Sequence, residues 1–337
     1  MSLKLFRVFL IVVAMVVLIV AADDGMKDWN LAQVSARNQK NNDKKTDYSI
    51  PFSLYENSPI KIDPKVFDND LGTKDPNKKP TTVVGQTPPK PLISAEAYLV
   101  GNLDTSKVYV EHNSAHIFPI ASLSKLVTAL VAIHKMQADQ KVTVTAKMLE
   151  AYGQAGHLVE GETLTVGELF YPLLLESSND AAEAIAQSYG YDNFIIEMNN
   201  FVKSLGMKST SFKDASGLSS GNSSNVQDLF TLAKYLYSNE KDLLSLTKKT
   251  EMTLASTTEH GEHVFHTINP FPYDPHFIGG KTGRTDEAKE SMISMFRYVS
   301  GLSTYPVAII VLRSDFSSRE VDSSALYIQA IHKIQGN

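Results

Sequence analysis

Residues 119–136 have the sequence "PIASLSKLVTALVAIHKM", a largely apolar run whose polar residues near the start include Ser122 and Lys125. The part from residue 123 to residue 136 is apolar on nearly every face of a helix, and Pro119 lies just before it. This pattern predicts a helix that begins near Ser122 and is buried inside a domain. Such a helix would lie at the centre of the fold, with Ser122 at its amino end.

Ser122 and Lys125 have the spacing of residues that share one face of a helix. A serine at a helix amino terminus lies near free backbone N–H groups and the positive end of the helix dipole, which suit an oxyanion. Burial would lower the pKa of Lys125 toward neutrality and let it accept the proton of Ser122. The same serine could instead be an ordinary helix cap. The spacing alone leaves both interpretations open.

The Ser-x-x-Lys spacing occurs four times, beginning at Ser58, Ser122, Ser238 and Ser245. Ser58 lies in a polar stretch without a predicted scaffold. Ser238 and Ser245 belong to "SNEKDLLSLTKK", which is typical of a solvated helix face. Only Ser122 opens a helix that the fold must bury, so its surroundings favour it over the other three.

Composition narrows the possible functions. The chain has 337 residues, 43% of them hydrophobic, which is enough for a substantial core. The formal net charge of −5 offers no electrostatic basis for nucleic-acid binding. The absence of cysteine excludes disulfides, thiolate catalysis and cysteine-ligated zinc.

The amino terminus has the charge order of an export signal. Lys4 and Arg7 precede an unbroken apolar run over 8–22, and two aspartates follow it. Residues 1–22 are therefore expected to be a cleaved signal peptide or a retained membrane anchor, and the length of the run suits either. Residues 23–91 mix charged residues with Asn, Gln and Pro and are expected to form a disordered linker. The remainder would be extracytoplasmic, in the periplasm or at the cell surface.

A regular pattern begins at about residue 92 and predicts a domain over 92–337. "AEAYLVGNLDTSKVYVEHN" predicts a β-hairpin, and "VGELFYPLLLES", "NDAAEAIAQSY", "DNFIIEMNNFVKSL" and "NVQDLFTLAKYLYS" predict helices. Three strand-like runs follow, "MTLAST", "MISMFRYVS" and "YPVAIIVLR", with a closing helix near 318–335. Strands at both ends and helices between them predict an α+β fold with an inserted helical subdomain.

Two competing motifs are less convincing. "GLSSG" at 217–221 matches the G-x-S-x-G nucleophile elbow centred on Ser219, but no apolar strand precedes it and no helix follows, so a loop is favoured. His260, His263 and His266 form a cluster with neighbouring glutamates but lack an H-E-x-x-H pattern. An exposed hairpin is favoured there over a metal site.

Two further segments supply partners for Ser122. "LLLESSNDAAEAIA" places Ser177 and Asn179 at a break between two predicted helices. "FIGGKTGRTDEA" contains the chain's only Lys-Thr-Gly, Lys281 to Gly283, just before a predicted strand, and its glycines would allow close approach to a ligand. Ser-x-x-Lys, Ser-x-Asn and Lys-Thr-Gly in this order are found in penicillin-binding proteins and class A β-lactamases.

From about residue 93 to the carboxyl terminus, the chain resembles the serine D-alanyl-D-alanine carboxypeptidases, which are low-molecular-mass penicillin-binding proteins. The resemblance rests on "AYLVGNLDTSKVYVEHN", "FPIASLSKLVTALVA", "LLLESSNDAAEAIA", "SLGMKSTSFKDASGLS" and "GGKTGRTDEA". It implies the fold shared by penicillin-binding proteins and β-lactamases, an antiparallel sheet flanked by helices with a helical subdomain.

The resemblance also implies roles for individual residues. Ser122 would be the acylated nucleophile, Lys125 the general base, and Ser177 a proton relay to the leaving D-alanine. The oxyanion hole would consist of the backbone N–H groups of Ser122 and Arg284. The implied substrate-binding set is Asn179, Lys281, Thr282, Gly283, Arg284 and Arg319.

The implied reaction is attack by Ser122 on the D-Ala-D-Ala amide, release of D-alanine and hydrolysis of the acyl-enzyme by water. The implied partners are peptidoglycan stem peptides, and β-lactams would be inhibitors that acylate the same serine. The implied chemistry requires no metal or organic cofactor. Residues 8–22 would provide a membrane tether if they are retained.

The chain departs from the family pattern at two positions. Lys289 stands where relatives usually have the glycine of T-D-x-A-G, and Arg284 is bulkier and more charged than expected. These two departures leave open a non-catalytic, tethered penicillin-binding module as one alternative function. The other alternative, in the same mechanistic class, is a D,D-endopeptidase that cuts peptidoglycan cross-links. A β-lactamase is disfavoured because the sequence shows no clear candidate for the deacylating glutamate.

Overall fold

The computed structural model describes residues 93–153 and 155–336. The expected signal or anchor segment over 1–22 and the expected linker over 23–91 lie outside the described residues. Within the described part of the chain, no helix is long and apolar enough to cross a membrane.

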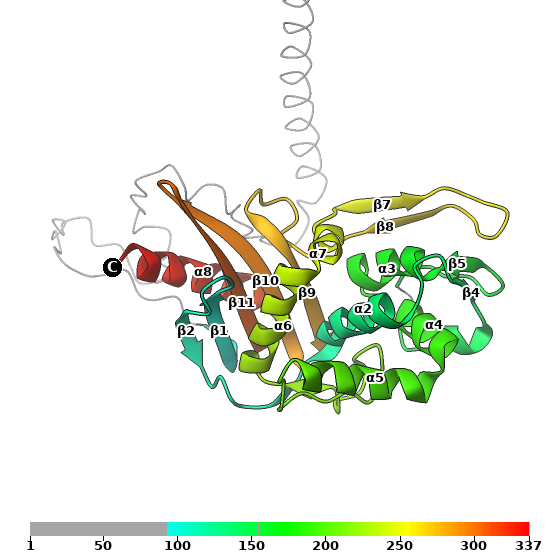
Figure 1. The fold of residues 1–337 in the computed structure, drawn as a ribbon, viewed down its shortest axis with the longest axis horizontal. Coiled ribbons are helices and arrows are strands. Elements are labelled where there is room, and N and C mark those ends of the chain that lie inside the picture. The colour runs from blue at the N-terminus through cyan, green and yellow to red at the C-terminus, as the bar shows by residue number, and fades with distance from the viewer. Residues whose placement is uncertain (1–92, 154, 337) are drawn as a thin grey trace, which may run out of the picture. The chain divides into compact units, whose positions relative to one another are not determined.

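A five-stranded sheet forms one half of the described structure (Figure 1). Its strand order is β2-β1-β11-β10-β9, and every neighbouring pair is antiparallel. Strands β1 and β2 form the predicted hairpin, and β9, β10 and β11 come from the carboxyl-terminal part of the chain. The bounds are β1 Ala97–Asn102, β2 Val108–His112, β9 Phe277–Thr285, β10 Lys289–Ser300 and β11 Ser303–Ser314.

The central strand β11 is buried on both faces, which explains its unbroken apolar sequence. Successive side chains of a strand point to opposite faces, so its residues divide into two sets. One face packs into the core shared with the helical subdomain through Ala308, Ile310 and Leu312. The other face packs into a second core through Val307, Ile309 and Val311.

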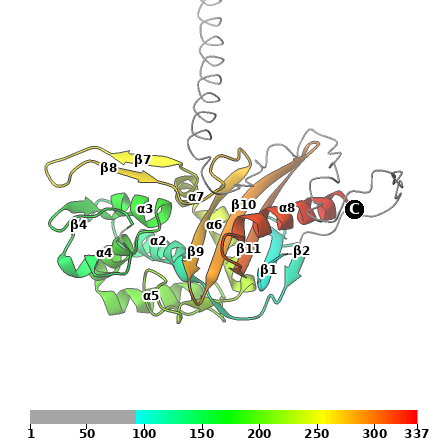
Figure 2. The ribbon, with the colours of Figure 1, turned by 180° about the vertical axis from the view of Figure 1, so that it is seen from behind.

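Helices cover both faces of the sheet. Helix α6 (Val226–Asn239) contacts β1, β10 and β11 on the face that Figure 1 presents. Helix α8 (Arg319–Gln335) contacts β1, β2, β10 and β11 on the opposite face, which Figure 2 presents. The short helix α7 (Lys241–Thr247) lies against the edge strand β9. The predicted α+β architecture is thereby confirmed.

The helical subdomain surrounds α2 (Ser124–Lys135), which contacts α3 (Val166–Leu175), α4 (Asn179–Tyr189) and α5 (Tyr191–Ser204). Every residue of α2 from Ser124 to Ala132 is buried. The prediction of a buried helix on this segment is confirmed, and three neighbouring helices pack against it.

Three two-stranded ribbons complete the strands of the described residues. Two of them are β3 (Phe118–Pro119) with β6 (Ser223–Ser224) and β4 (Lys141–Thr143) with β5 (Thr163–Thr165). The third is the hairpin of β7 (Glu251–Leu254) and β8 (His263–His266), which extends above α3 in Figure 1.

The β7–β8 hairpin corrects one expectation about the histidine cluster. The segment is a hairpin as predicted, but only His266 is exposed, whereas His260 and His263 are each 7% exposed. His263 Nε2 lies 3.1 Å from a carboxylate oxygen of Glu162, so the buried imidazole attaches the hairpin to the β4–β5 region. No group of three or more potential ligands in the described residues is placed to hold a metal ion.

Candidate active site

Ser122 lies in a single 3₁₀ turn, Ala121–Leu123, that leads directly into α2. The interpretation of Ser122 as a helix cap is wrong, because the cap positions are Ile120 for the turn and Leu123 for α2, and neither makes a side-chain cap. The Ser122 hydroxyl instead lies 2.9 Å from Lys125 Nζ. The preceding Ala121 has φ +50°, a strained conformation for a residue with a Cβ atom.

Lys125 is completely buried, and its amine has three oxygen neighbours. Besides Ser122 Oγ, Nζ lies 2.7 Å from Asn179 Oδ1 and 2.6 Å from the Ser216 carbonyl oxygen. The amide and carbonyl oxygens can only accept hydrogen bonds. A neutral amine has two N–H groups and one lone pair, so it satisfies both acceptors and keeps its lone pair for the Ser122 hydroxyl proton.

The environment of Lys125 favours this neutral form. Burial lowers the pKa of Lys125 to about 7, although the negative charges of Asp214 and Glu183 oppose the shift. A base with a pKa close to neutral pH is partly deprotonated there and retains enough basicity to take up a proton.

Ser177 and Lys281 form a second hydrogen-bonded pair. Ser177 lies between α3 and α4, as predicted, in a left-handed conformation with φ +62°. Lys281 Nζ donates to Ser177 Oγ at 2.7 Å and to the Thr282 carbonyl oxygen at 3.0 Å. Burial lowers the pKa of Lys281 well below its ordinary value, with further contributions from the charges of Lys125 and Arg319.

Asn179 is the first residue of α4 and connects Lys125 to a neighbouring loop. Its Oδ1 accepts from Lys125, while its Nδ2 donates to the Tyr152 carbonyl oxygen at 2.6 Å. These two contacts fix the orientation of the amide group.

The Lys-Thr-Gly segment lies inside β9, whereas the sequence suggested a position just before a strand. Gly283 explains how closely this edge strand approaches the nucleophile. A Cβ atom on Gly283 would lie 2.8 Å from the Ile120 carbonyl oxygen and 3.2 Å from the backbone nitrogen of Ser122. The absence of a side chain therefore lets β9 lie against the turn that carries Ser122.

The remaining predicted site residues also lie on or beside β9. Thr282 is buried, and Arg284 is exposed with its guanidinium 4.9 Å from the centre of the Phe316 ring. Arg319 donates from Nη1 to the Gly283 carbonyl oxygen at 3.2 Å and lies 3.8 Å from a carboxylate oxygen of Glu290. All nine predicted residues thus belong to one region around Ser122 and β9.

Lys289 occupies the position at which relatives usually have glycine, and the backbone shows why glycine suits it. Its φ is +49°, in the left-handed region, at the first residue after the β9–β10 turn. The Lys289 ammonium lies 3.1 Å from carboxylate oxygens of both Glu96 and Asp315. The lysine therefore contacts two surface carboxylates and makes none of the hydrogen bonds around Ser122.

Three groups of the site have no motif in the sequence: two backbone carbonyls that accept from Lys125 or Asn179, and one carboxylate that accepts from the loop beside Lys125. They are the Ser216 carbonyl, the Tyr152 carbonyl and the Asp214 carboxylate. Asp214 and Ser216 belong to the loop that also contains "GLSSG", and the prediction that this segment is a loop is confirmed. The family likeness of "KDASGLS" is the sequence signal that points to Asp214 and Ser216.

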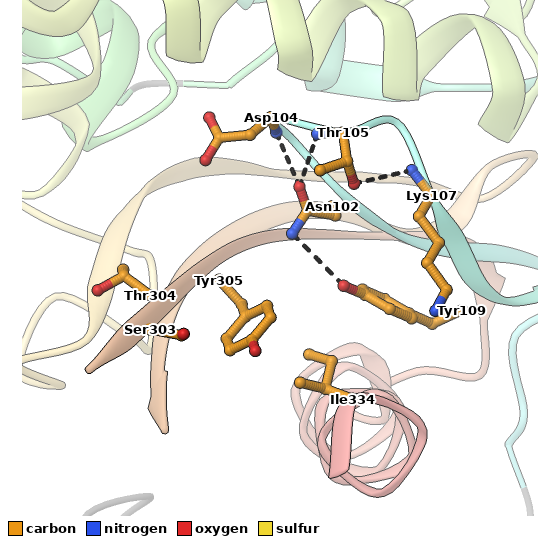
Figure 3. A pocket seen from close by; sticks show the side chains of 9 residues that line it. All are labelled: Asn102, Asp104, Thr105, Lys107, Tyr109, Ser303, Thr304, Tyr305 and Ile334. Atoms are coloured by element: carbon orange, nitrogen blue, oxygen red, sulfur yellow. Dashed lines mark hydrogen bonds between the residues drawn. The ribbon is translucent and has the colours of Figure 1, made fainter. Parts of the chain in front are cut away.

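A separate pocket of about 420 Å³ lies between the β1–β2 turn, the β10–β11 turn and α8. Figure 3 shows its lining, which includes Tyr109, Tyr305 and Ile334. None of the predicted site residues lines it. The Asn102 side chain in the pocket wall stabilises the β1–β2 turn, because its Oδ1 accepts hydrogen bonds from the backbone nitrogens of Asp104 and Thr105.

The fold and site define a class. Acyl transfer requires a nucleophile and a base beside it, and here these are the Ser122 hydroxyl and the buried Lys125 amine, with a second serine–lysine pair and a close edge strand next to them. These features, on an antiparallel sheet with a helical subdomain, belong to the serine peptidases with the penicillin-binding-protein fold. The family model described as "D-alanyl-D-alanine carboxypeptidase" matches residues 84–312, and the chain belongs to that family.

Two curated relatives show the range of names in this family. The chain is 33% identical over 197 residues to D-alanyl-D-alanine carboxypeptidase DacF of Bacillus subtilis, covering 55% of this chain and 50% of the relative. It is 30% identical over 246 residues to a D-alanyl-D-alanine endopeptidase of Escherichia coli, covering 68% of this chain and 75% of the relative. The matched region spans about half the length of DacF and of the Haemophilus influenzae endopeptidase.

Solved structures show the same fold. The D-alanyl-D-alanine carboxypeptidase from Mycobacterium tuberculosis superimposes with a TM-score of 0.66 at 24% identity, covering 74% of this chain and 94% of that one. The DD-transpeptidase of Streptomyces K15 gives a TM-score of 0.65 at 25% identity, covering 72% and 98% respectively. The predicted fold class is confirmed by these similarities.

Proposed function

We propose that this chain is a serine D,D-carboxypeptidase that removes the terminal D-alanine from peptidoglycan stem peptides through an acyl-enzyme on Ser122. The observation that carries the proposal is the contact of Ser122 Oγ with the buried Nζ of Lys125, whose other two neighbours accept hydrogen bonds. Membership of the D-alanyl-D-alanine carboxypeptidase family supports the choice of substrate.

In the first step, Lys125 takes the Ser122 proton as Oγ attacks the carbonyl carbon of the penultimate D-alanine. The negative charge on the carbonyl oxygen is stabilised by the backbone N–H groups of Ser122 and Arg284. Loss of one such donor costs about 3–4 kcal/mol of transition-state stabilisation in comparable enzymes. Gly283 supports this assignment because it lets β9 lie against the backbone of Ser122.

Collapse of the intermediate breaks the amide bond, and the leaving amine of D-alanine must receive a proton. Ser177 is proposed to relay it, since Lys281 holds the Ser177 hydroxyl at 2.7 Å. Asn179 would donate to the substrate amide carbonyl, and Lys281, Thr282 and Arg319 would bind the terminal carboxylate. Water then hydrolyses the acyl-enzyme and regenerates Ser122.

A D,D-endopeptidase activity on cross-linked peptides is the second candidate. It is favoured by the similarity to endopeptidases of Escherichia coli and Pseudomonas aeruginosa, of which the match covers 75% and 77%. Incubation of the full chain with a stem pentapeptide and with cross-linked dimers, followed by mass analysis, tests both activities. Release of D-alanine supports the carboxypeptidase, and conversion of dimers to monomers supports the endopeptidase. If neither product forms, both proposed activities are contradicted.

We also propose that the enzyme acts outside the cytoplasm, in the periplasm or at the cell surface. The support is the basic–apolar–acidic order over the first 24 residues, together with a substrate that belongs to the cell wall. Cell fractionation tests this, and the mass of the recovered chain distinguishes a cleaved signal peptide from a retained tether over 8–22.

A further inference from the structure

The turn beside Lys125 is held by a carboxylate that the reaction itself does not use. Asp214 Oδ1 accepts from the backbone nitrogens of Ser216, at 2.9 Å, and Gly217, and Oδ2 accepts from that of Ser219 at 2.6 Å. One carboxylate thus accepts hydrogen bonds from three backbone N–H groups. This arrangement sets the direction of the carbonyl groups in the same turn.

Two carbonyl groups of this turn point at α2. The Ser216 carbonyl accepts from Lys125 Nζ at 2.6 Å, and the Ala215 carbonyl accepts from Thr128 Oγ1 at 2.6 Å. Gly217 lies against the nucleophile turn, because a Cβ atom there would come within 2.1 Å of the Ala121 carbonyl oxygen. The turn therefore contacts both the base and the backbone that positions Ser122.

Asn222 attaches the same turn to the start of α2. Its Oδ1 accepts from the backbone nitrogens of Lys213 and Asp214, and its Nδ2 donates to Ser124 Oγ at 3.0 Å and to the Asp214 carbonyl oxygen at 2.9 Å. The ends of the turn are thus fixed to α2 through Asn222, and its middle is fixed by the Asp214 carboxylate.

We infer that Asp214 is a positioning residue for Lys125: its carboxylate holds the Ser216 carbonyl on one N–H of the amine, so that the lone pair faces Ser122. The inference rests on the proposed function, since it concerns the base of the acylation step. Without Asp214 the three N–H groups would lose their acceptor, and the Ser216 carbonyl would no longer be fixed.

The charge of Asp214 acts on Lys125 as well. The charged groups that face Lys125 are Asp214 from the turn, Glu183 from α4 and Lys281 from β9. The two carboxylates favour the protonated amine and therefore raise the pKa of Lys125 against the effect of burial. Replacing Asp214 with a neutral residue should lower that pKa and extend acylation to lower pH.

The experiment measures the rate of acylation of the full chain by a fluorescent penicillin between pH 5 and pH 9. Asp214→Asn removes the charge and keeps one acceptor oxygen, whereas Asp214→Ala removes both oxygens. The matched control is Asp228→Asn, because Asp228 likewise binds the Ser209 backbone and the Thr210 hydroxyl but does not contact Lys125.

We expect the acid limb of the Asp214→Asn profile to move to lower pH by about 0.5–1 unit, with the rate at high pH within about tenfold of wild type. Asp214→Ala should lose about 10²-fold in rate, since misplacement of the base by about 1 Å has effects of that size. Asp228→Asn should match wild type in both respects.

The inference is overturned if Asp214→Asn keeps the wild-type acid limb, or if Asp228→Asn moves it equally. A wild-type acylation rate for Asp214→Ala also overturns the inference. If that variant does not fold, the acid limbs of Asp214→Asn and Asp228→Asn are sufficient to test the inference. Failure of the wild-type chain to react with penicillin would contradict the proposed function instead, which separates the two failures.

Discussion

At the scale of single residues, the strongest feature of the molecule is the completely buried amine of Lys125. Its cost in solvation is offset by three oxygen neighbours, and its pKa of about 7 makes it a base at neutral pH. Lys281 is also buried and has a lowered pKa, but its partners are Ser177 and the Thr282 carbonyl. The two lysines therefore form hydrogen bonds with different serines, Lys125 with Ser122 and Lys281 with Ser177.

The lowered pKa of Lys125 predicts how stability depends on pH. The folded state loses this proton at a pH of about 7, whereas the unfolded chain keeps it until about pH 10.4. Between these values the unfolded state binds more protons, so the free energy of unfolding should rise with pH. Denaturant titrations at pH 7 and pH 9 measure the rise. It should be smaller in Lys125→Met, and an equal rise in both proteins would contradict the assignment.

Lys289→Gly tests whether the departure from the family pattern affects the site. Glycine relieves the left-handed backbone at φ +49° but removes the contacts with Glu96 and Asp315. Because these effects oppose each other, we expect the melting temperature to change by no more than about 3 °C. The penicillin acylation rate should stay within about threefold of wild type. Lys289→Ala keeps the strain and loses the contacts, so it should melt below Lys289→Gly.

At the scale of elements, sequence pattern predicted most of the secondary structure because the helices and strands bury periodic apolar sets. The edge strand β9 is the exception. Its glycines lack the side chains that mark a strand, so the sequence pattern predicts Lys-Thr-Gly just before a strand, whereas it lies inside β9. The contributions of Tyr152 and Ser216 could not be predicted, because each acts through a carbonyl group that every residue possesses. The burial of His260 and His263 depends on long-range docking of the hairpin.

Gly283→Ala tests the close approach of β9 to the nucleophile turn. The added methyl group would lie 2.8 Å from the Ile120 carbonyl oxygen, so the strand or the turn must shift. A shift of about 1 Å at the oxyanion site should reduce the acylation rate by about 10²-fold. Gly261→Ala is the matched control, because its methyl group meets only Glu162 Oε1 at an ordinary 3.6 Å. Equal rates in the two variants would show that β9 does not form the site.

At the scale of the whole molecule, the site around Ser122 is assembled from segments far apart in sequence. Four of them are the start of α2, the α3–α4 junction, the Asp214 turn and β9, and Arg319 at the start of α8 contacts β9. The sheet supplies the edge strand and the helical subdomain supplies both serines, so the site exists only where the two parts of the fold meet. The three motifs identified the start of α2, the α3–α4 junction and β9, and the family match over 84–312 spans these three and the Asp214 turn but not Arg319.

The measurement that tests the central claim most directly is covalent labelling of the full chain by a fluorescent penicillin, followed by mass analysis of the labelled peptide. The account predicts one label on wild type, located on Ser122, and none on Ser122→Ala, which should melt as a folded protein. A wild-type chain that does not react, or a Ser122→Ala chain that is labelled as well as wild type, would contradict the assignment of Ser122 as the nucleophile.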